Sequence, residues 1–502
     1  MSVDLGLRLM ALVLAGLALP RWLRVAQREH YLPRRAAWAW ALWTSRSPRA
    51  VALAALMFVL FLLGLAVPLL LVPAALLGAV LPVGLPFRGR TSPLAWTPRV
   101  RRLAAATAVL VAASCLLASA SLAVAAVVAL PFLVDLGLAA TAPLERRLSA
   151  KYLVQARATM QRVRPTVVAI TGSYGKTTTK AYLGHLLAQT RAVLASPASF
   201  NNELGLSRAV NEHLVPGTEV FIAEMGTYGP GEIARLCELF PPDVAVLTAI
   251  GEMHLERMRD KQGVLAAKSE ITPGARVVVV NNDDPLLRRL ADECAARGQQ
   301  VVRCSVTDPT ADVCLTDGAL TVRGEPLGTF APPDIVHPGN VACALGAALA
   351  LGADLAALAG RIATLPTVAH RLEPLAQPGG SWILDDTYNS NPDGAREAVR
   401  RAVALAARSG GQAHLVTPGM VELGPVQGER NEQLARSAAE AGVATLVVVG
   451  RTNAPALRRG AFDGRTEVLS APTRESAVAL LATRTRAGDV VLFENDLPDH
   501  YP

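Results

Sequence analysis

The chain has 502 residues, enough for roughly two to four domains. It is 51% hydrophobic and only 18% charged, with a mean hydropathy of +0.33, so it is too apolar for a purely soluble protein. The formal net charge is +8, but the arginines cluster beside apolar runs, which indicates membrane topology and not nucleic-acid binding. We therefore expect no nucleic-acid partner.

The cysteines are scattered along the chain, at positions 115, 237, 294, 304, 314 and 343. They form no Cys-x-x-Cys pair, and no histidine cluster accompanies them. Neither a structural zinc site nor a disulfide framework is expected, and the pattern suits a reducing cytoplasm.

Two long apolar blocks, at 50–87 and 103–142, lie in the first 150 residues and contain no lysine or arginine. Each is nearly twice the ~20 residues that one membrane span needs, so we predict that each forms a helical hairpin. The bend is expected at Pro68 and Pro73 in the first block and at Ser119 to Ser121 in the second. Buried core helices are the alternative.

Basic segments flank these blocks at 21–49, 88–102 and 146–151. The positive-inside rule places all three segments in the cytoplasm. A further apolar stretch, Leu5 to Leu19, is short and contains Arg8, and we interpret it as a short span, an uncleaved anchor or an interfacial helix. The sequence thus predicts a multi-pass protein of the cell membrane, with four or five transmembrane helices in residues 1–150 and a cytoplasmic remainder.

The segment Thr171–Thr178 reads T-G-S-Y-G-K-T-T, between a β-branched run at 166–170 and a helix-like segment at 179–188. In such a loop, backbone N–H groups and the helix N-terminus hold phosphates, the lysine meets the outer phosphates and the threonine hydroxyl meets Mg²⁺. The sequence therefore predicts ATP binding by Gly172, Ser173, Gly175, Lys176, Thr177 and Thr178. The motif is the short form G-x-x-G-K-T, for which a chance turn is the alternative.

Beyond residue 164, strand-like and helix-like segments alternate, which predicts doubly wound α/β domains. The strand-like runs are 220–223, 244–248, 277–280, 383–384, 414–417, 445–449 and 490–493. Ligands of such sheets bind at the carboxyl ends of the strands, which makes Glu224 and His254 candidates for binding a metal or orienting water. A helix-capping glutamate and a structural histidine are the alternatives, and Lys268 taken alone is an ordinary helix lysine.

Two polar clusters complete the candidate sites. Asn201-Asn202-Glu203-Leu204-Gly205 precedes a helix-like segment, and Asp385 to Pro392 follows a strand. The second cluster is dense in side chains that bind ribose or amide groups. A capping turn and a plain Asx turn are the alternatives.

Taken together, these residues resemble the Mur ligases, ATP-dependent amide ligases of peptidoglycan precursor synthesis, and most closely the branch that adds D-alanyl-D-alanine. The resemblance covers about residues 165 to 460. It rests on ordered segments: Thr171–Thr178, Phe200–Gly205, Glu224–Gly226, Pro230–Ile233, Pro242–Ala245, His254–Glu256, Ala267–Glu270, Asn282–Pro285, Arg371–Glu373, Asp385–Pro392 and Met420–Gly424. It implies a membrane region at 1–150, a P-loop central ATP-binding domain at 151–364 and a Rossmann-like C-terminal ligase domain at 365–502.

The resemblance also implies a mechanism. The γ-phosphate of ATP would pass to a substrate carboxylate, and an amine would attack the resulting acyl phosphate to form the amide. Lys176 would hold the β- and γ-phosphates, and Thr177 and Glu224 would share one Mg²⁺. His254 would hold a second Mg²⁺, joined by Lys268 if that lysine is carbamylated.

The remaining roles come from the same resemblance. Asn340 would approach the adenine, Arg371 the nucleotide phosphates, and Asp386 the ribose. The expected substrate contacts are Asn201, Asn202, Asn389 and Asn391, with the last two near the incoming amine. The substrates would be a peptidoglycan precursor, UDP-linked or lipid-linked, and an amino acid or dipeptide.

The chain departs from the family pattern at several places. Gly339 stands where the family often has histidine, Pro418-Gly419 where it has Gly-Asp, and Phe493–Asp496 where it has a basic Lys-Gly-Ser-Arg. Membrane helices replace the soluble domain for the UDP-sugar, so we hypothesise an acceptor that is lipid-linked or captured at the membrane surface. A polyglutamate-type ligase of the same superfamily and a membrane P-loop ATPase coupled to transport are the alternatives.

Overall fold

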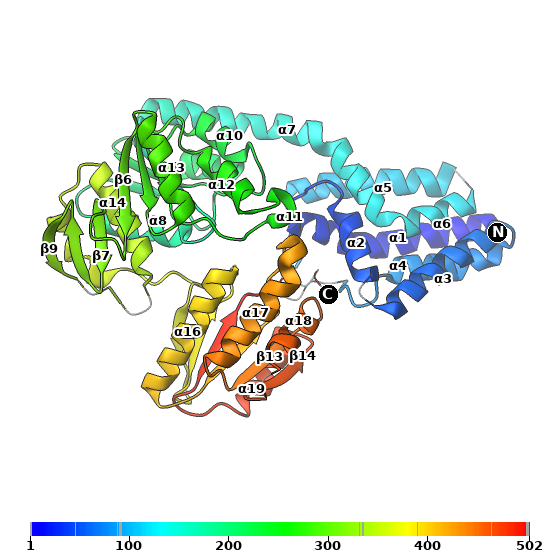
Figure 1. The fold of residues 1–502 in the computed structure, drawn as a ribbon. Helices are drawn as coiled ribbons and strands as arrows, with labels where there is room; N and C mark the ends of the chain where they lie inside the picture. The colour runs from blue at the N-terminus through cyan, green and yellow to red at the C-terminus, as the bar shows by residue number, and fades with distance from the viewer. Residues whose placement is uncertain are drawn as a thin grey trace. The chain divides into compact units, whose positions relative to one another are not determined.

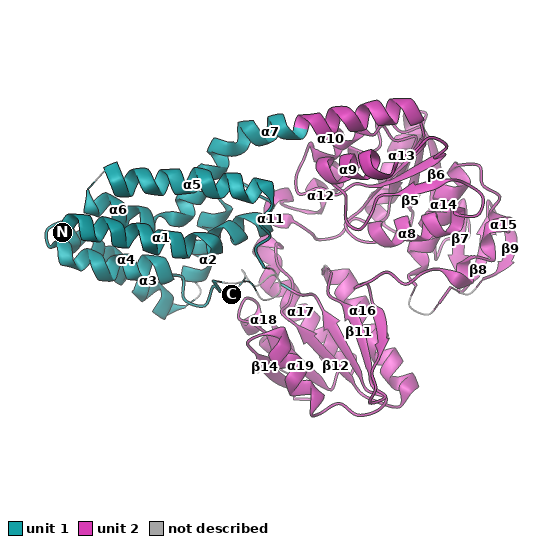
Figure 2. Cartoon of the chain, turned by 180° about the vertical axis from the view of Figure 1, so that it is seen from behind, with its two compact units in different colours: residues 1–149, 497–502 teal, residues 150–496 magenta. Residues whose placement is uncertain are grey.

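The computed structural model describes residues 3–45, 47–87, 89, 93–117, 119–330, 332–333, 336–388, 390–462, 464–497 and 501. The predicted substrate residue Asn389 and the flanking Arg46, Arg88 and Arg90 lie outside these residues. The chain divides into two compact units (Figure 2). Unit 1 comprises residues 1–149 and 497–502, and unit 2 comprises residues 150–496.

Unit 1 is helical in its described residues (Figure 1). Its elements are α1 (Val3–Arg28), α2 (Arg35–Ser45), α3 (Pro48–Gly64), η1 (Pro68–Leu70), α4 (Leu71–Val80), α5 (Pro98–Leu117), α6 (Ala120–Val128) and the first part of α7 (Leu130–Val163). Small side chains let the helices approach closely: Ala11, Ala15 and Ala18 of α1 are buried in the core that α1 shares with α4, α5 and α6.

The two predicted hairpins bend close to the expected places. In the first block, α3 ends at Gly64 and η1 begins at Pro68, whereas Pro73 lies inside α4. In the second, α5 ends at Leu117 and the Ser119 side chain caps α6. A second bend, of 82°, separates α6 from α7.

The N-terminal apolar stretch is longer than the sequence suggested. It forms α1, a helix of 26 residues that runs through Pro20. By length and composition, α1 and α5 could each cross a membrane, and the total rises to four if each bent pair, α2 with α3 and α6 with α7, is one span. Large apolar side chains such as Leu17, Leu62, Leu69 and Val109 are exposed on this unit, which is unusual for a surface in water.

Charged side chains inside unit 1 satisfy helix ends. The Arg21 guanidinium is fully buried and donates to the carbonyls of Ala79, Val80 and Leu81 at the C-terminus of α4. The Asp135 carboxylate accepts hydrogen bonds from the backbone N–H groups of residues 36 and 37 in the first turn of α2. Arg21, counted above in a cytoplasmic flank, therefore belongs to the helical core.

Unit 2 contains two sheets. The central sheet has nine strands in the order β2-β3-β1-β4-β5-β6-β7-β8-β9, parallel from β2 to β7 and antiparallel beyond. Its strands are β1 (Thr166–Thr171), β2 (Val193–Ala195), β3 (Val220–Glu224), β4 (Val244–Leu247), β5 (Val277–Asn281), β6 (Gln300–Ser305), β7 (Val313–Thr316), β8 (Ala319–Val322) and β9 (Glu325–Thr329).

Helices cover both faces of the central sheet (Figure 1). One face packs on α8 (Lys176–Leu187) and α14 (Pro338–Ala350). The other packs on α9 (Glu203–His213), α10 (Glu232–Leu239), α12 (Lys261–Ser269) and α13 (Pro285–Ala296). Four strands, β1, β3, β4 and β5, are buried on both faces of the sheet, and their sequences are therefore continuous apolar runs. These runs are the pattern from which the strands were predicted.

The C-terminal sheet has six strands in the order β10-β11-β15-β12-β13-β14, parallel except for β10. Its strands are β10 (Glu373–Ala376), β11 (Trp382–Asp386), β12 (Ala413–Thr417), β13 (Thr445–Val449), β14 (Glu467–Ala471) and β15 (Val490–Glu494). Its helices are α16 (Pro392–Ser409), α17 (Gln427–Glu440), α18 (Ala454–Gly460) and α19 (Arg474–Ala482). Two mostly parallel sheets with flanking helices confirm the predicted α/β class.

Candidate active site

The phosphate-binding loop joins β1 to α8 at the carboxyl edge of the central sheet. Helix α8 begins at Lys176, three positions earlier than the sequence suggested, so Lys176, Thr177 and Thr178 lie in its first turn. Gly175 has φ 82°, and a Cβ there would collide with the Asn340 side-chain oxygen. The loop is tight, and Asn340 of α14 lies directly over it.

Hydrogen bonds fix the loop to the segment that follows β4, the strand beside β1. The Ser173 hydroxyl donates to the Gly251 carbonyl at 3.2 Å and accepts from the Gly251 N–H at 2.9 Å. The Lys176 ammonium donates to the Gly172 carbonyl at 2.8 Å, so the loop folds around its own lysine. Burial lowers the Lys176 pKa to about 8, with Glu224 opposing and Arg371 adding to that shift.

Glu224 is the last residue of β3, the strand beside β1, and its side chain is almost fully buried. Its Oε2 lies 3.0 Å from the Nζ of Lys180, and its Oε1 accepts from the Asn201 amide at 3.3 Å. Burial alone would raise the pKa of Glu224, but Lys180 and Lys176, with a hydrogen bond from Thr177, hold it below its ordinary value. The Thr177 hydroxyl and the Glu224 carboxylate therefore lie side by side, and oxygen atoms of this kind are the ligands that Mg²⁺ prefers.

Lys268 lies on α12 and is almost fully buried. Burial, reinforced by the charge of Lys176, lowers its pKa well below the ordinary value. The amine is thereby biased toward the neutral form, which is the form able to react with carbon dioxide. His254 caps α11 (Leu255–Met258) with φ 53°, and its Nδ1 lies 2.5 Å from Oε2 of Glu422.

Arg371, just before β10, brings a positive charge toward the loop, and Asp386 lies close enough to interact with that charge. The Arg371 guanidinium stacks over the Tyr388 ring at 4.2 Å, and its charge interacts with those of Glu224 and Lys176. Asp386 ends β11 and accepts from the Leu372 N–H at 3.2 Å. Burial raises the Asp386 pKa to about 6, and Arg371 opposes that shift.

Two of the predicted substrate residues also cap helices. Asn202 caps α9 by accepting from the Gly205 N–H at 2.9 Å, and Asn391 caps α16 by accepting from the Gly394 N–H at 2.9 Å. These are the capping and Asx turns that the sequence left open. Asn201, in contrast, is brought to Glu224, and the substrate roles of all three remain predictions.

The structure brings three further residues to this region that were not predicted as site residues from the sequence: Lys180, Glu422 and Arg430. Lys180 follows the phosphate loop by one helical turn, and that spacing was the available signal. Glu422 was noted only within a motif, and Arg430 pairs with Glu252 across the two sheets at 2.5 and 2.9 Å. Nothing in the sequence spacing links residues so far apart in the chain.

Comparisons with known proteins agree with this geometry. The Mur ligase middle domain matches residues 170–336, and the Mur ligase glutamate ligase domain matches residues 370–494. The UDP-N-acetylmuramoyl-tripeptide–D-alanyl-D-alanine ligase of Mycobacterium tuberculosis is 32% identical over 366 residues, covering 66% of this chain and 70% of the relative. The chain belongs to the Mur ligase family. The Bacillus subtilis ligase of the same name is 32% identical over 54% of this chain and 60% of its own length.

Solved structures give the same family fold. The MurF ligase from Thermotoga maritima in complex with ADP is 29% identical with a TM-score of 0.57, covering 69% of this chain and 80% of that one. MurF from Acinetobacter baumannii, at 23% identity, has a TM-score of 0.59 over 69% of this chain and 77% of its own. As a Mur ligase, the chain is an ATP-dependent amide ligase. Both family matches begin after unit 1.

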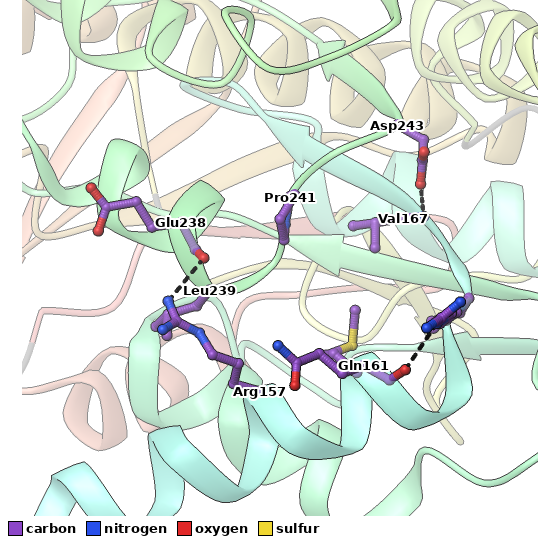
Figure 3. Close-up of a pocket in the computed structure, with 10 residues that line it drawn as sticks. Arg157, Gln161, Val167, Glu238, Leu239, Pro241 and Asp243 are labelled. Atoms are coloured by element: carbon purple, nitrogen blue, oxygen red, sulfur yellow. Dashed lines mark hydrogen bonds between the residues drawn. The ribbon is translucent and has the colours of Figure 1, made fainter.

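A separate hollow of about 380 Å³ lies at the opposite, amino edge of the central sheet (Figure 3). Gln161 of α7, Val167 of β1 and Asp243 before β4 line it, and the Arg157 guanidinium at its side donates to the Glu238 carbonyl at 3.3 Å. Parallel sheets place their ligands at the other edge, so this hollow does not belong to the candidate active site.

Proposed function

We propose that the chain adds D-alanyl-D-alanine, or a similar amine, to the peptide of a peptidoglycan precursor at the cytoplasmic face of the cell membrane. The observation that carries the proposal is the convergence of Lys176, Thr177, Glu224 and Lys268 at one sheet edge, with Arg371 facing them. The relatives whose names specify this amine, at 32% identity over two thirds of the chain, support the choice of substrate.

This cluster neutralises the negative charge of the phosphate and carboxylate groups that react. Transfer of the γ-phosphate to a carboxylate brings two anions together, and the Lys176 ammonium and the Arg371 guanidinium offset their repulsion. The tight loop at Gly172 and Gly175 lets backbone N–H groups approach the phosphates. Asn340, which lies against Gly175, remains our candidate for the adenine contact, and Asp386 remains our candidate for the ribose contact.

The donor set fits Mg²⁺. Thr177 and Glu224 offer adjoining oxygens, which would hold one ion, and His254 would take part in holding a second. Lys268 fits carbamylation, because its amine is buried and its pKa is lowered, and a carbamate would turn it into an anionic oxygen ligand. When bound, Mg²⁺ would supply further neutralisation of the phosphate oxygens.

Unit 1 supports placement at a membrane. Its exposed apolar side chains and its two helices of sufficient length and hydropathy fit a bilayer better than water. Asp135, an acid within the second apolar block, accepts hydrogen bonds from the N-terminus of α2. Because Asp135 has this structural role, we favour a membrane anchor over a transporter, which would need ionisable groups lining a path across the membrane.

The acceptor substrate has two candidate forms, UDP-linked and lipid-linked. Since both family matches begin beyond residue 169 and unit 1 precedes them, we propose that the acceptor is lipid-linked or is captured at the membrane surface. A carrier lipid would hold the reacting peptide near the bilayer, where the anchored catalytic unit would meet it at high effective concentration.

The test is product analysis by mass spectrometry. The full chain, purified in nanodiscs, is incubated with ATP, Mg²⁺, D-alanyl-D-alanine and either the UDP-linked or the lipid-linked tripeptide. We expect ADP release that depends on the amine, together with an amide product, and faster turnover of the lipid-linked acceptor. Exclusive turnover of the UDP-linked form would overturn the acceptor proposal, and product with glutamate alone would favour the polyglutamate alternative.

A further inference from the structure

His254 and Glu422 meet although they lie far apart in the chain. The Nδ1 of His254, on the loop after β4, lies 2.5 Å from the Oε2 of Glu422, which belongs to the C-terminal matched domain. The Glu256 N–H also donates to the Glu422 carbonyl, at 3.4 Å. Side chain and backbone therefore fix this carboxylate against α11.

Both residues have unusual backbone conformations. His254 has φ 53° and Glu422 has φ 62°, in the left-handed region that non-glycine residues seldom occupy. Such conformations are energetically costly and persist where the surrounding structure imposes them, often at functional sites. Two of them facing each other across a hydrogen bond indicate a contact that the fold specifies.

Hydrogen bonds within the C-terminal domain hold the segment that carries Glu422. The buried Asn431 accepts from the Met420 N–H at 2.8 Å and donates to the Met420 carbonyl at 2.9 Å. The buried Asn453 donates to the same carbonyl at 3.0 Å. The position of the carboxylate therefore follows the position of the C-terminal domain as a whole.

The chemistry of this contact is directional. A carboxylate accepts, so the Nδ1 of His254 must carry the proton, and in the neutral ring the Nε2 then presents its lone pair. The Tyr228 ring, edge-on to the imidazole at 5.0 Å between centroids, restricts its rotation. A carboxylate that accepts a hydrogen bond from one ring nitrogen of a histidine orients the ring and makes the other nitrogen a better metal ligand.

We propose that Glu422 is a positioning residue that fixes the tautomer and orientation of His254 for metal binding, so that docking of the C-terminal domain and binding of the ion favour each other. This inference rests on the proposed role of His254 as a Mg²⁺ ligand. Coupling between two events is reciprocal, so the ion must strengthen docking by the same factor by which docking strengthens ion binding.

The test measures binding of Mn²⁺, by electron paramagnetic resonance of the free ion, to the full chain in nanodiscs with ADP. We expect Glu422→Ala to weaken the affinity of the His254 site about 10- to 100-fold. Glu467→Ala is the matched control: its carboxylate belongs to the same domain and pairs with the exposed Arg484, and we expect unchanged affinity. An affinity of Glu422→Ala within twofold of wild type would overturn the inference.

A double-mutant cycle separates positioning from a general loss of charge. If Glu422 acts through His254, the Glu422→Ala change should have no further effect in a His254→Ala background. An equal loss in both backgrounds would show that Glu422 acts on the ion independently. Glu422→Gln, which keeps shape and an acceptor oxygen, should bind Mn²⁺ more tightly than Glu422→Ala, and the reverse order would contradict positioning.

A tautomer measurement gives a readout independent of ligase activity. In the chain labelled with ¹⁵N-histidine, the His254 signals, assigned by their loss in His254→Ala, should show protonated Nδ1 and unprotonated Nε2. Averaged tautomers in the wild type would contradict the inference. If the ligase assay fails while these signals and the Mn²⁺ results hold, the proposed substrates are wrong and the positioning role stands.

Discussion

Lys180 and Glu224 form a buried ion pair beneath the phosphate loop. The Nζ of Lys180 lies 3.0 Å from the Oε2 of Glu224, and the side chains are 6% and 2% exposed. The same Nζ donates to the Ala198 carbonyl at 2.6 Å, in the turn that leads to Asn201. Lys180 thus links the loop helix, the carboxylate that we propose binds Mg²⁺ and the predicted substrate turn.

Removing the lysine should leave a buried carboxylate without its partner. We expect Lys180→Met to lower the free energy of unfolding of unit 2 by about 3–5 kcal/mol, as for other broken buried pairs. Denaturant titration followed by circular dichroism measures it. Arg208→Met, which breaks the exposed Arg208–Glu212 pair on α9, is the control and should cost less than about 1 kcal/mol.

The double variant Lys180→Met/Glu224→Gln should recover much of that loss, because the unpaired charge is removed with the lysine. A double variant as unstable as Lys180→Met alone would show that the loss comes from packing and not from the uncompensated carboxylate.

Lys176 should be essential for turnover. Lys176→Ala removes the ammonium that we propose holds the outer phosphates, and we expect ADP release to fall at least about 10²-fold, the scale of losing one transition-state charge. Lys176→Arg keeps the charge but not the compact shape and should recover little. Retained ADP release in Lys176→Ala would refute the phosphate-binding role.

Glu494 makes the stability of the C-terminal domain pH-dependent. It is fully buried at the end of β15 and accepts from the hydroxyls of Thr417, at 2.6 Å, and Ser390. Burial raises its pKa from 4.5 to about 7, against these hydrogen bonds. The folded chain therefore binds a proton more tightly than the unfolded chain, and this group's contribution to stability declines as the pH rises from 4.5 through 7.

Glu494→Gln keeps the neutral shape at every pH. We expect it to stabilise the protein at pH 8, by up to about 3 kcal/mol, and to change little at pH 4.5. Thermal denaturation midpoints of both proteins across this pH range give the comparison. An equal shift at both pH values would mean that ionisation of Glu494 is not the cause.

The exposed apolar surface of unit 1 should decide membrane association. Leu17 of α1 is 66% exposed, and Leu17→Arg should disfavour insertion by about 3 kcal/mol if that surface meets lipid. Val154→Arg, at a 69% exposed position on α7 in unit 2, is the control and should insert as the wild type does. Extraction at alkaline pH from vesicles measures the inserted fraction, and equal extraction of both variants would contradict a lipid-facing α1.

The sequence by itself determined the family, the α/β class and the phosphate loop. These are local signals: the loop is contiguous, and the buried parallel strands are written as unbroken apolar runs such as Val244–Leu247. It also located one bend in each apolar block, because Pro68 and Ser119 interrupt helices by local chemistry, but it missed the further bend between α6 and α7. It underestimated α1, because Arg8 and the buried Arg21 suggested an end where the helix continues.

Only the tertiary structure decided which side chains meet. Lys180, on the helix after β1, reaches Glu224 because β1 and β3 are neighbours in the sheet. Glu422 reaches His254 because a segment of the C-terminal domain contacts the loop after β4. Asn202 and Asn391 each use the side-chain oxygen to cap a helix. The residue type alone cannot distinguish this use from ligand binding. Long-range pairing depends on strand order and on burial, and neither quantity is encoded in the spacing of residues along the chain.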